Sequence, residues 1–427
     1  MKGKFVLLLA LIGLTASARD SRQEIRLTPE KAGGVYYAYP GPQADSLFTV
    51  PGGYKPFYIS HYGRHGSRYL ISDRDYLRVL ERLNHADSLG ALTPLGRDVL
   101  DRVRLVWDEA RGRGGELTPL GARQHRGIAR RMGLAYPEVF ADSLARITAA
   151  STTVMRCAHS MFAFVEGLKE LYPYLNIPRE SGARNMYYLN YHSPESGPYS
   201  SENGPWYEPY KAFKADKTRP DRLVASIFAD PEYVRQHVSP SDFMWDIYWL
   251  AVDMQNMETP VSFMDLLTND EIYNLWEVFN FNFYSCNSSY PPAEGHFTAN
   301  ASNLVRNILT ESDRYIGDEG AHGTTLRFGH DGNIIPLTAL MRLEGCYSDV
   351  TDPYALAADY ADYSISPMAS NLQLIFLRNE TDPSDVIVKI TLNEHDITVD
   401  GVAPDATGPY YRWPTLRKHL SEIINPD

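Results

Sequence analysis

Two histidines, two arginines and two glycines share eight consecutive positions, residues 61–68, in the sequence HYGRHGSR. Arginine presents planar, bidentate donors that match phosphate oxygens better than lysine does. A neutral imidazole attacks phosphorus and holds it covalently, which divides one difficult step into two. Gly66 permits close approach of the backbone to a ligand. The segment therefore predicts a site for a small anion, with His65 flanked by Arg64 and Arg68.

Hydrolysis of a phosphomonoester also needs an acid that protonates the departing alkoxide. Arg156 follows a second predicted strand, and His330 with Asp331 follows a third. Each of these residues alone has an ordinary explanation, as a solvated arginine at a helix start or as a turn. Together they favour one site, because ligands of α/β sheets bind at the ends of strands. His61 and His125 are expected to be structural.

Strands and helices alternate around these segments. Three β-rich runs, each ending directly before one of the predicted site segments, predict strands: residues 55–60, 145–152 and 324–329. We expect HYGRHGSR to form the loop after the first strand. Thr93 and Thr118, each followed by proline, predict the N-caps of two helices. Two later runs predict a hairpin: residues 372–379 and 386–394.

Helical patterns dominate from about residue 223 to residue 317, whereas residues 181–222 are rich in Tyr, Pro, Gly and Ser and are expected to be irregular. Strands thus flank a mostly helical middle. We predict an α/β fold: a three-layer α/β domain with a central mixed sheet, plus a smaller, mostly α-helical inserted domain. The expected boundaries are 19–180 and 318–427 for the α/β domain and 181–317 for the inserted domain.

The first eighteen residues have the three parts of a signal peptide. Lys2 and Lys4 form a positive region, residues 5–14 are apolar, and residues 16–18 form an A-x-A cleavage pattern. We predict a signal peptide over residues 1–18, so a periplasmic or secreted protein; a buried N-terminal strand is the alternative. No other stretch is long and apolar enough to predict a membrane span in the mature chain.

The formal net charge is −12, which disfavours nucleic acid as a partner. Residues 56–168 differ from the rest, with sixteen Arg, no Lys and twelve acidic residues, and this local positive balance favours a small anionic ligand. Cys157, Cys286 and Cys346 leave room for one disulfide without indicating the pair. Because none lies in a C-x-x-C spacing, we expect no zinc site.

Four segments resemble those of the histidine acid phosphatases. YISHYGRHGSR resembles the R-H-G-x-R signature, and GELTPLGARQHRGIARRM resembles the stretch that follows it. STTVMRCAHSMFAFVEGL resembles the segment of the third arginine, especially in the multiple inositol polyphosphate phosphatase branch. LRFGHDGNIIPLTALM resembles the H-D or H-A-E segment. The four occur in family order between residue 55 and about residue 345.

This resemblance implies a role for each residue. His65 is expected to be the nucleophile that forms a phosphohistidine, and Asp331 the general acid that later assists the attack of water. Donors to the phosphoryl oxygens are expected from four residues: Arg64, Arg68, Arg156 and His330. The resemblance implies neither a metal nor another cofactor. Neighbouring positive charge disfavours imidazolium, so we expect His65 to stay neutral and the enzyme to work in mild acid.

The expected partner is a phosphorylated small molecule, with inositol polyphosphates such as phytate first. The H-A-E branch has its acid two residues after the histidine, but here Gly332 stands at that position and Asp331 directly follows His330, as in acid phosphatases and many phytases. A broad-specificity acid phosphatase for sugar phosphates or nucleotides is the alternative. Arg74, just after the signature, is a candidate substrate contact or an exposed arginine at a helix start.

Two other functions compete with this interpretation. A phosphotransferase similar to phosphoglycerate mutase is disfavoured by the export signal and by the H-D segment. A non-catalytic glycan-binding module would stack sugars on the Tyr- and Trp-rich residues 187–213, which otherwise form a packed irregular segment. The oligomeric state is not predicted.

Overall fold

The computed structural model describes residues 19–42, 50–190, 192–405 and 408–425. The predicted signal peptide, residues 1–18, lies outside the described residues. An eight-stranded sheet has the order β3-β2-β4-β1-β5-β6-β7, with β8 paired to β6. Its strands are β1 (Tyr54–Arg64), β2 (Arg146–Ser151), β3 (Arg179–Glu180), β4 (Gly323–Gly329), β5 (Asn371–Asn379), β6 (Val386–Leu392), β7 (His395–Asp396) and β8 (Tyr410–Arg412).

The sheet is mixed, as predicted. Strands β1, β2, β3 and β4 pair in parallel, whereas β5 pairs antiparallel to both β1 and β6. Strand β1 therefore lies between a parallel and an antiparallel neighbour. The three strands expected from the β-rich runs are present, and so is the late hairpin, formed by β5 and β6.

One boundary of the first strand was wrong. The segment HYGRHGSR was expected to be a loop, but β1 continues to Arg64. It does so because it pairs on both sides up to its end, Arg64 with Gly329 of β4 and Gly63 with Asn371 of β5. Only residues 65–68 form the loop.

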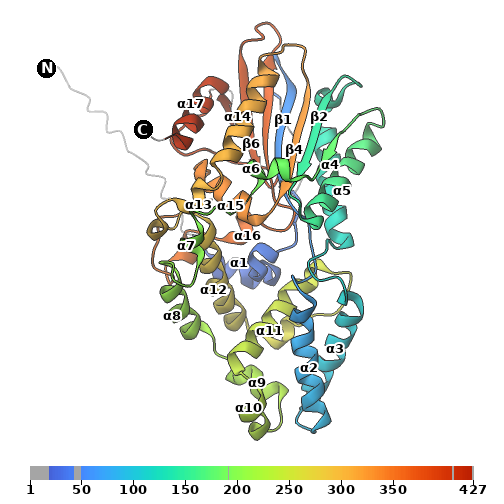
Figure 1. Ribbon diagram of the computed structural model, residues 1–427, viewed down its shortest axis with the longest axis vertical. Helices are drawn as coiled ribbons and strands as arrows, with labels where there is room; N and C mark the ends of the chain where they lie inside the picture. The colour runs from blue at the N-terminus through green and yellow to red at the C-terminus, as the bar shows by residue number, and fades with distance from the viewer. Residues whose placement is uncertain (1–18, 43–49, 191, 406–407, 426–427) are drawn as a thin grey trace, which may run out of the picture.

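Helices cover both faces of the sheet and make three layers (Figure 1). One layer is α4 (Pro119–Ala135) and α5 (Met155–Leu171). The other layer is α6 (Met186–Leu189), α14 (Ser302–Ile316) and α17 (Trp413–Ile424). Thr118 caps α4 as predicted, since its Oγ1 accepts a hydrogen bond from Gly121 N (3.2 Å). Alternate residues of β1 face the two layers: Ile59 packs towards α4 and α5, and Tyr58 stacks on Tyr315 of α14.

The other helices gather mainly at one end of the sheet, in the lower half of Figure 1. They are α1 (Ser21–Leu27), α2 (Asp73–Ser88), α3 (Pro94–Ala110), α7 (Gly197–Ser200), α8 (Tyr207–Lys217), α9 (Asp221–Ile227), α10 (Pro231–His237), α11 (Pro240–Asp253), α12 (Asn269–Asn287), α13 (His296–Ala299), α15 (Asp331–Leu340) and α16 (Asp362–Ile365). Two short 3₁₀ segments matter below: η1 (Pro29–Tyr36) and η4 (Met254–Asn256).

The helical part draws on more of the chain than the predicted insertion. Helices α2 and α3 pack against α11 and α9, respectively, whereas α14, from within residues 181–317, lies along the sheet. The predicted domain boundaries therefore stay a prediction. Residues 181–222 were expected to be irregular, but α8 covers eleven of them, because Tyr210 and Phe213 face a buried apolar cluster.

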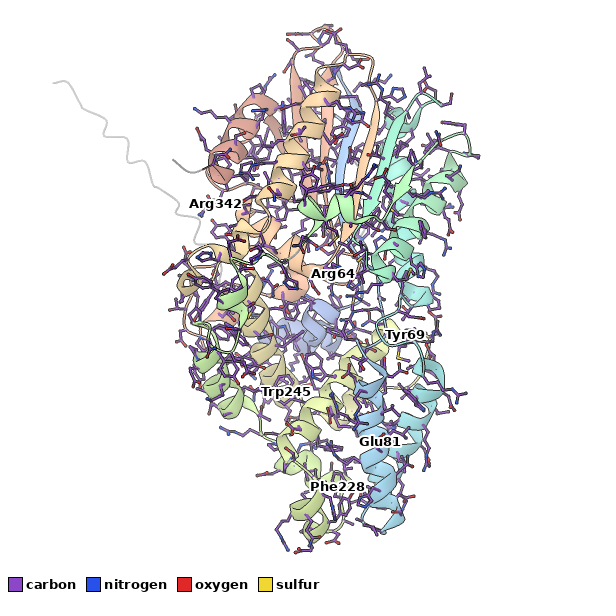
Figure 2. The ribbon with its side chains drawn as sticks, in the orientation of Figure 1. Arg64, Tyr69, Glu81, Phe228, Trp245 and Arg342 are labelled. Atoms are coloured by element: carbon purple, nitrogen blue, oxygen red, sulfur yellow. The ribbon has the colours of Figure 1, made fainter. Side chains whose placement is uncertain are left out.

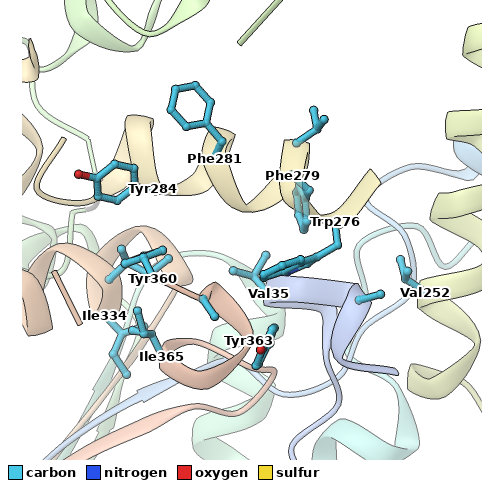
Figure 3. Close-up of a cluster of buried hydrophobic side chains, with 14 of the residues drawn as sticks. Val35, Val252, Trp276, Phe279, Phe281, Tyr284, Ile334, Tyr360, Tyr363 and Ile365 are labelled. Carbon is cyan, nitrogen blue, oxygen red and sulfur yellow. The ribbon is translucent and has the colours of Figure 1, made fainter. Parts of the chain in front are cut away.

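An aromatic core joins the helical part to the segments that lead into the sheet (Figure 3). Trp276 of α12 lies against Val35 of η1 and against Tyr363 of α16, with ring centroids 5.3 Å apart for the two aromatic side chains. The three cysteines, Cys157, Cys286 and Cys346, are all free, so the disulfide for which the sequence left room is absent from the described residues.

Candidate active site

The parallel pairing of β1 and β4 brings the predicted segments together. Because Arg64 pairs with Gly329, residues 65–68 and residues 330–331 leave the sheet at the same level. The backbone N–H of His65 donates to Gly329 O (2.9 Å). The rings of His65 and His330 lie edge to face, with centroids 5.7 Å apart. The two predicted histidines are therefore neighbours.

Two glycines let the loop pack directly on α4. A Cβ atom on Gly66 would lie 2.5 Å from Gly121 O, and one on Gly121 would lie 2.3 Å from Ser67 O. The loop is also tied to α5, because Gly66 N donates to Ser160 Oγ (3.1 Å), which in turn donates to Arg156 O (2.8 Å). Helix α5 thus holds its arginine in a fixed relation to the loop.

His65 is buried, and one of its ring nitrogens has a hydrogen-bond partner. Its Nδ1 lies 2.9 Å from the carbonyl oxygen of Gly66, so a proton on Nδ1 is donated there and Nε2 keeps its lone pair. Burial lowers the pKa of His65 well below its usual value, and the positive charges of Arg64 and Arg156 lower it further. The imidazole is therefore neutral even in mild acid.

Arg64 is completely buried at the junction of the sheet and the helical part (Figure 2). Its Nη1 donates to two carbonyl oxygens, those of Val35 and Ser366, and its Nη2 donates to Asp331 Oδ2 (2.7 Å). Among the described residues its Nε has no hydrogen-bond partner. The guanidinium is fixed on one side, and its Nε and one Nη2 hydrogen are left for another acceptor.

Arg68 and Arg156 add positive charge around the same histidines. Arg68 is buried, with its guanidinium 4.5 Å above the ring of Tyr36 and its Nη1 donating to Tyr69 O (2.8 Å). Arg156 lies half-buried in the first turn of α5. After burial, its charge is the largest cause that lowers the pKa of His330, to about 3. His330 is therefore neutral as well.

His330 and Asp331 begin helix α15. His330 Nε2 lies 3.2 Å from Thr152 Oγ1 and 3.5 Å from Cys157 Sγ, and its backbone N–H donates to Tyr62 OH (3.1 Å). Asp331 is about a quarter exposed, 23%, and pairs with Arg64. Burial tends to raise the pKa of Asp331, but the charges of Arg64 and its neighbours and the hydrogen bond from the backbone N–H of Gly332 together outweigh it and hold that pKa below the usual value. The carboxylate of the free enzyme is therefore ionised.

The sequence did not predict the polar groups that support the loop. Ser67 Oγ donates to Asn256 Oδ1 of η4 (2.7 Å) and accepts from Gln124 Nε2 of α4 (2.9 Å). Gln124 lies on the buried face of its helix, and a polar residue at an apolar position was the one signal available for it. Asn256 sits in a short segment without a periodic pattern, so no signal marked it.

Arg74 lies apart from the contacts described above. It is in the first turn of α2, its side chain is 59% exposed, and its Nη1 donates to Glu81 Oε2 (2.7 Å). Its role as a substrate contact stays a prediction. His61 and His125 lie in the core beside Phe328, as expected for structural residues.

The described part of the chain contains no group of three or more His, Cys, Asp or Glu side chains arranged to hold a metal ion. Among the described helices, none is long and apolar enough to cross a membrane.

Solved structures share this fold over nearly the whole chain. The multiple inositol polyphosphate phosphatase of Bifidobacterium longum, solved with inositol hexasulfate, matches with a TM-score of 0.72 and 19% identity, covering 91% of this chain and 97% of that one. The phytase from D. castellii matches with a TM-score of 0.68 and 14% identity, covering 93% of this chain and 85% of that one. The Hafnia alvei phytase, in complex with myo-inositol hexakis sulphate, matches with a TM-score of 0.56 and 13% identity, covering 88% and 99%.

No curated protein sequence matches the chain. The model of the histidine phosphatase superfamily, branch 2, matches residues 64–393, which includes the loop after β1, the arginine of α5 and the start of α15. With these residues arranged around one pair of histidines, the chain belongs to branch 2 of the histidine phosphatase superfamily and is a phosphomonoester hydrolase.

Proposed function

We propose that the protein hydrolyses inositol polyphosphates such as phytate through a phosphohistidine on His65, with Asp331 as general acid. One observation carries the mechanism. Nδ1 of His65 donates a hydrogen bond to the carbonyl oxygen of Gly66, so Nε2 carries no proton and can attack phosphorus. Three arginines and His330 surround this imidazole.

In the first step, Nε2 of His65 attacks phosphorus and the bond between phosphorus and the ester oxygen breaks. Arg64, through Nε and Nη2, binds the equatorial oxygens as charge is redistributed among them. Asp331 gives its proton to the departing alkoxide, so the alcohol leaves neutral. The products are the free alcohol and phosphohistidine.

Asp331 must carry a proton in this step, although the free enzyme holds it ionised against Arg64. A bound phosphate dianion supplies the explanation. It brings negative charge beside the carboxylate and shares the guanidinium of Arg64, and both effects raise the pKa of Asp331. Binding and protonation are thus coupled, and acid pH favours both.

In the second step, water attacks the phosphorus of phosphohistidine. The Asp331 carboxylate takes the proton from that water, the bond between phosphorus and Nε2 breaks, and inorganic phosphate and neutral His65 are released. The residue that donates a proton in one step accepts one in the next, so the cycle closes without another group.

Inositol polyphosphates are favoured by two lines of support. The B. longum and H. alvei enzymes, which share this fold, were solved in complex with sulfated inositols. Three arginines, Arg64, Arg68 and Arg156, place positive charge around His65, which suits a phosphorylated ligand. We also propose that the protein is exported to the periplasm or secreted, as residues 1–18 suggest.

A substrate panel tests the proposal. Purified mature protein is given phytate, p-nitrophenyl phosphate, a sugar phosphate and a nucleotide between pH 3 and pH 8, and released phosphate is measured. We expect the highest kcat/KM for phytate, in mild acid. A similar kcat/KM for all esters would instead support the broad-specificity alternative. Rapid acid-free quenching with ³²P-labelled substrate should trap label on the wild type and none on the His65→Ala variant.

A further inference from the structure

The orientation of Arg64 depends on two backbone carbonyls from distant parts of the chain. Its Nη1 donates to Val35 O in η1 and to Ser366 O, which directly follows α16. Both hydrogens of Nη1 are used in this way, so the two oxygens set the plane of the guanidinium. They thereby decide which way Nε and the remaining Nη2 hydrogen point.

A single residue, Asp362, holds both carbonyl-bearing segments. Its carboxylate Oδ2 accepts from the backbone N–H of Val35 (3.2 Å). Its own backbone carbonyl accepts from Ser366 N (2.9 Å). Each carbonyl that contacts Arg64 therefore belongs to a residue whose N–H is bonded to Asp362.

The approach of η1 to Asp362 is unusually close. Gly34 adopts a left-handed backbone conformation, with φ of 55°, and a Cβ atom there would lie 2.4 Å from Asp362 Oδ2. Glycine makes both the conformation and the approach feasible. The contact between Val35 and the carboxylate is built into the turn.

Asp362 is itself anchored to the helical part. Its Oδ1 accepts from Trp276 Nε1 (3.0 Å), and its N–H donates to Asn280 Oδ1 (2.9 Å), both on α12. The carboxylate is completely buried, and Figure 3 shows Trp276 lying over Val35. Helix α12 is thereby connected to Arg64 through three successive hydrogen bonds: from Trp276 to Asp362, from Val35 N–H to Asp362, and from Arg64 to Val35 O.

We propose that Asp362 is a positioning residue for Arg64: its carboxylate fixes Val35 against α16, whose last backbone bond holds Ser366, and so orients the guanidinium towards the transferred phosphoryl group and links that orientation to helix α12. This inference rests on the proposed role of Arg64 in binding phosphate. Asp362 does not touch the substrate in this scheme. Asp362 therefore affects kcat only when Arg64 is present.

The Asp362→Asn variant tests the idea, because an amide keeps the size of the side chain but presents N–H groups where only acceptors fit. With p-nitrophenyl phosphate as substrate, we expect kcat to fall about 10- to 100-fold and KM to change by less than about threefold, since aim matters most in the transition state. Inhibition by vanadate, whose five-coordinate adduct resembles that state, should weaken more than inhibition by inorganic phosphate.

A double-mutant cycle with Arg64→Lys decides between positioning and general damage. In the Arg64→Lys background, Asp362→Asn should lower kcat by less than about twofold, because the bidentate group to be aimed is gone. An equal loss in both backgrounds would overturn the proposal. The matched control is Asp246→Asn on α11, a buried carboxylate paired with Arg78 and Arg82, which should leave kcat unchanged.

If Asp362→Asn does not fold, Trp276→Phe replaces it in the same cycle, since it removes the donor to Oδ1 and keeps an aromatic ring in the core. A smaller loss of kcat that again depends on Arg64 supports the proposal, and an independent loss refutes it. The proposed substrate is tested separately. If the wild type hydrolyses the nitrophenyl ester but releases no phosphate from phytate, the substrate proposal is wrong and the role of Asp362 is unaffected.

Discussion

Two pairs of buried histidines lie along the same central strands. His61 of β1 and His125 of α4 pack among Phe164 and Phe328, whereas His65 and His330 face each other just beyond the strand ends. Burial lowers the pKa of all four side chains, that of His125 to about 3. A lowered pKa therefore does not distinguish the pair proposed to act on phosphate from the pair in the core.

The difference lies in the partners. Around the core pair the neighbours are aromatic rings, and Arg327 has only a small effect on His61, whereas the other pair has several arginine charges and hydrogen bonds to Gly66 and Thr152. Burial among apolar groups is enough to keep a histidine neutral. For a neutral histidine to react with a phosphate, oriented donors must also bind the phosphate oxygens. The chemistry of the surroundings assigns the role.

The largest expected effect separates the two pairs directly. His65→Ala should lower kcat about 10⁴-fold or more, because no other group forms the covalent intermediate. His125→Leu should keep kcat within about tenfold, because the ring packs among Phe164 and Phe328 and meets the site only at the backbone of Arg64. Steady-state phosphate release from phytate measures both. Equal losses of kcat in the two variants would show that the two histidine pairs do not differ in their importance for catalysis.

A second prediction concerns acid stability. Because the pKa of His125 is about 3 in the folded protein and about 6.5 in an unfolded chain, the unfolded state binds the extra proton between those values. Stability is therefore lost as pH falls from 6.5 to 3, by on the order of 5 kcal/mol in full. His125→Leu should flatten this loss in urea unfolding at pH 7 and pH 4. Parallel curves for the two proteins would contradict the assigned environment.

Asp331 gives a third, smaller effect. Asp331→Asn should lower kcat for phytate about 100-fold, because the alkoxide then leaves without a proton. The nitrophenyl ester has a good leaving group and should lose less than about tenfold. Stopped-time assays with both esters provide the test, and equal losses would remove the general-acid role from Asp331.

The smallest effect is expected at Arg74. Its exposed pair with Glu81 contributes about 0.5 kcal/mol or less, so Arg74→Ala should hardly change the free energy of unfolding. We also expect KM for phytate and for p-nitrophenyl phosphate to stay within about twofold. A rise in KM for phytate alone would make Arg74 the substrate contact that the sequence suggested.

Much of the fold was predictable because its strands are short, β-rich runs that end where the chemistry begins. The predicted site residues lie in three segments with recognisable side-chain patterns: the loop after β1, the first turn of α5 and the start of α15. The end of β1 was misplaced, since a histidine and a glycine inside a strand are recognised only once β4 and β5 pair with them.

The orienting groups were not predictable for a physical reason. Val35 and Ser366 act through backbone carbonyls, which every residue has, so their types reveal nothing. Asp362 and Asn256 act over long sequence separations, and a lone polar residue is ordinary until its neighbours are known. Side chains that meet the substrate leave a motif, but groups that hold those side chains do not.

The position of β1 at the centre of the sheet also governs when the molecule can form. Its two neighbours, β4 and β5, begin at Gly323 and Asn371, so a ribosome has completed most of the chain before β1 finds either one. Contacts of such long sequence separation form slowly and leave strand edges open meanwhile. The nascent chain therefore carries its catalytic loop unpaired for most of synthesis, and activity arises only after the last quarter of the chain has emerged.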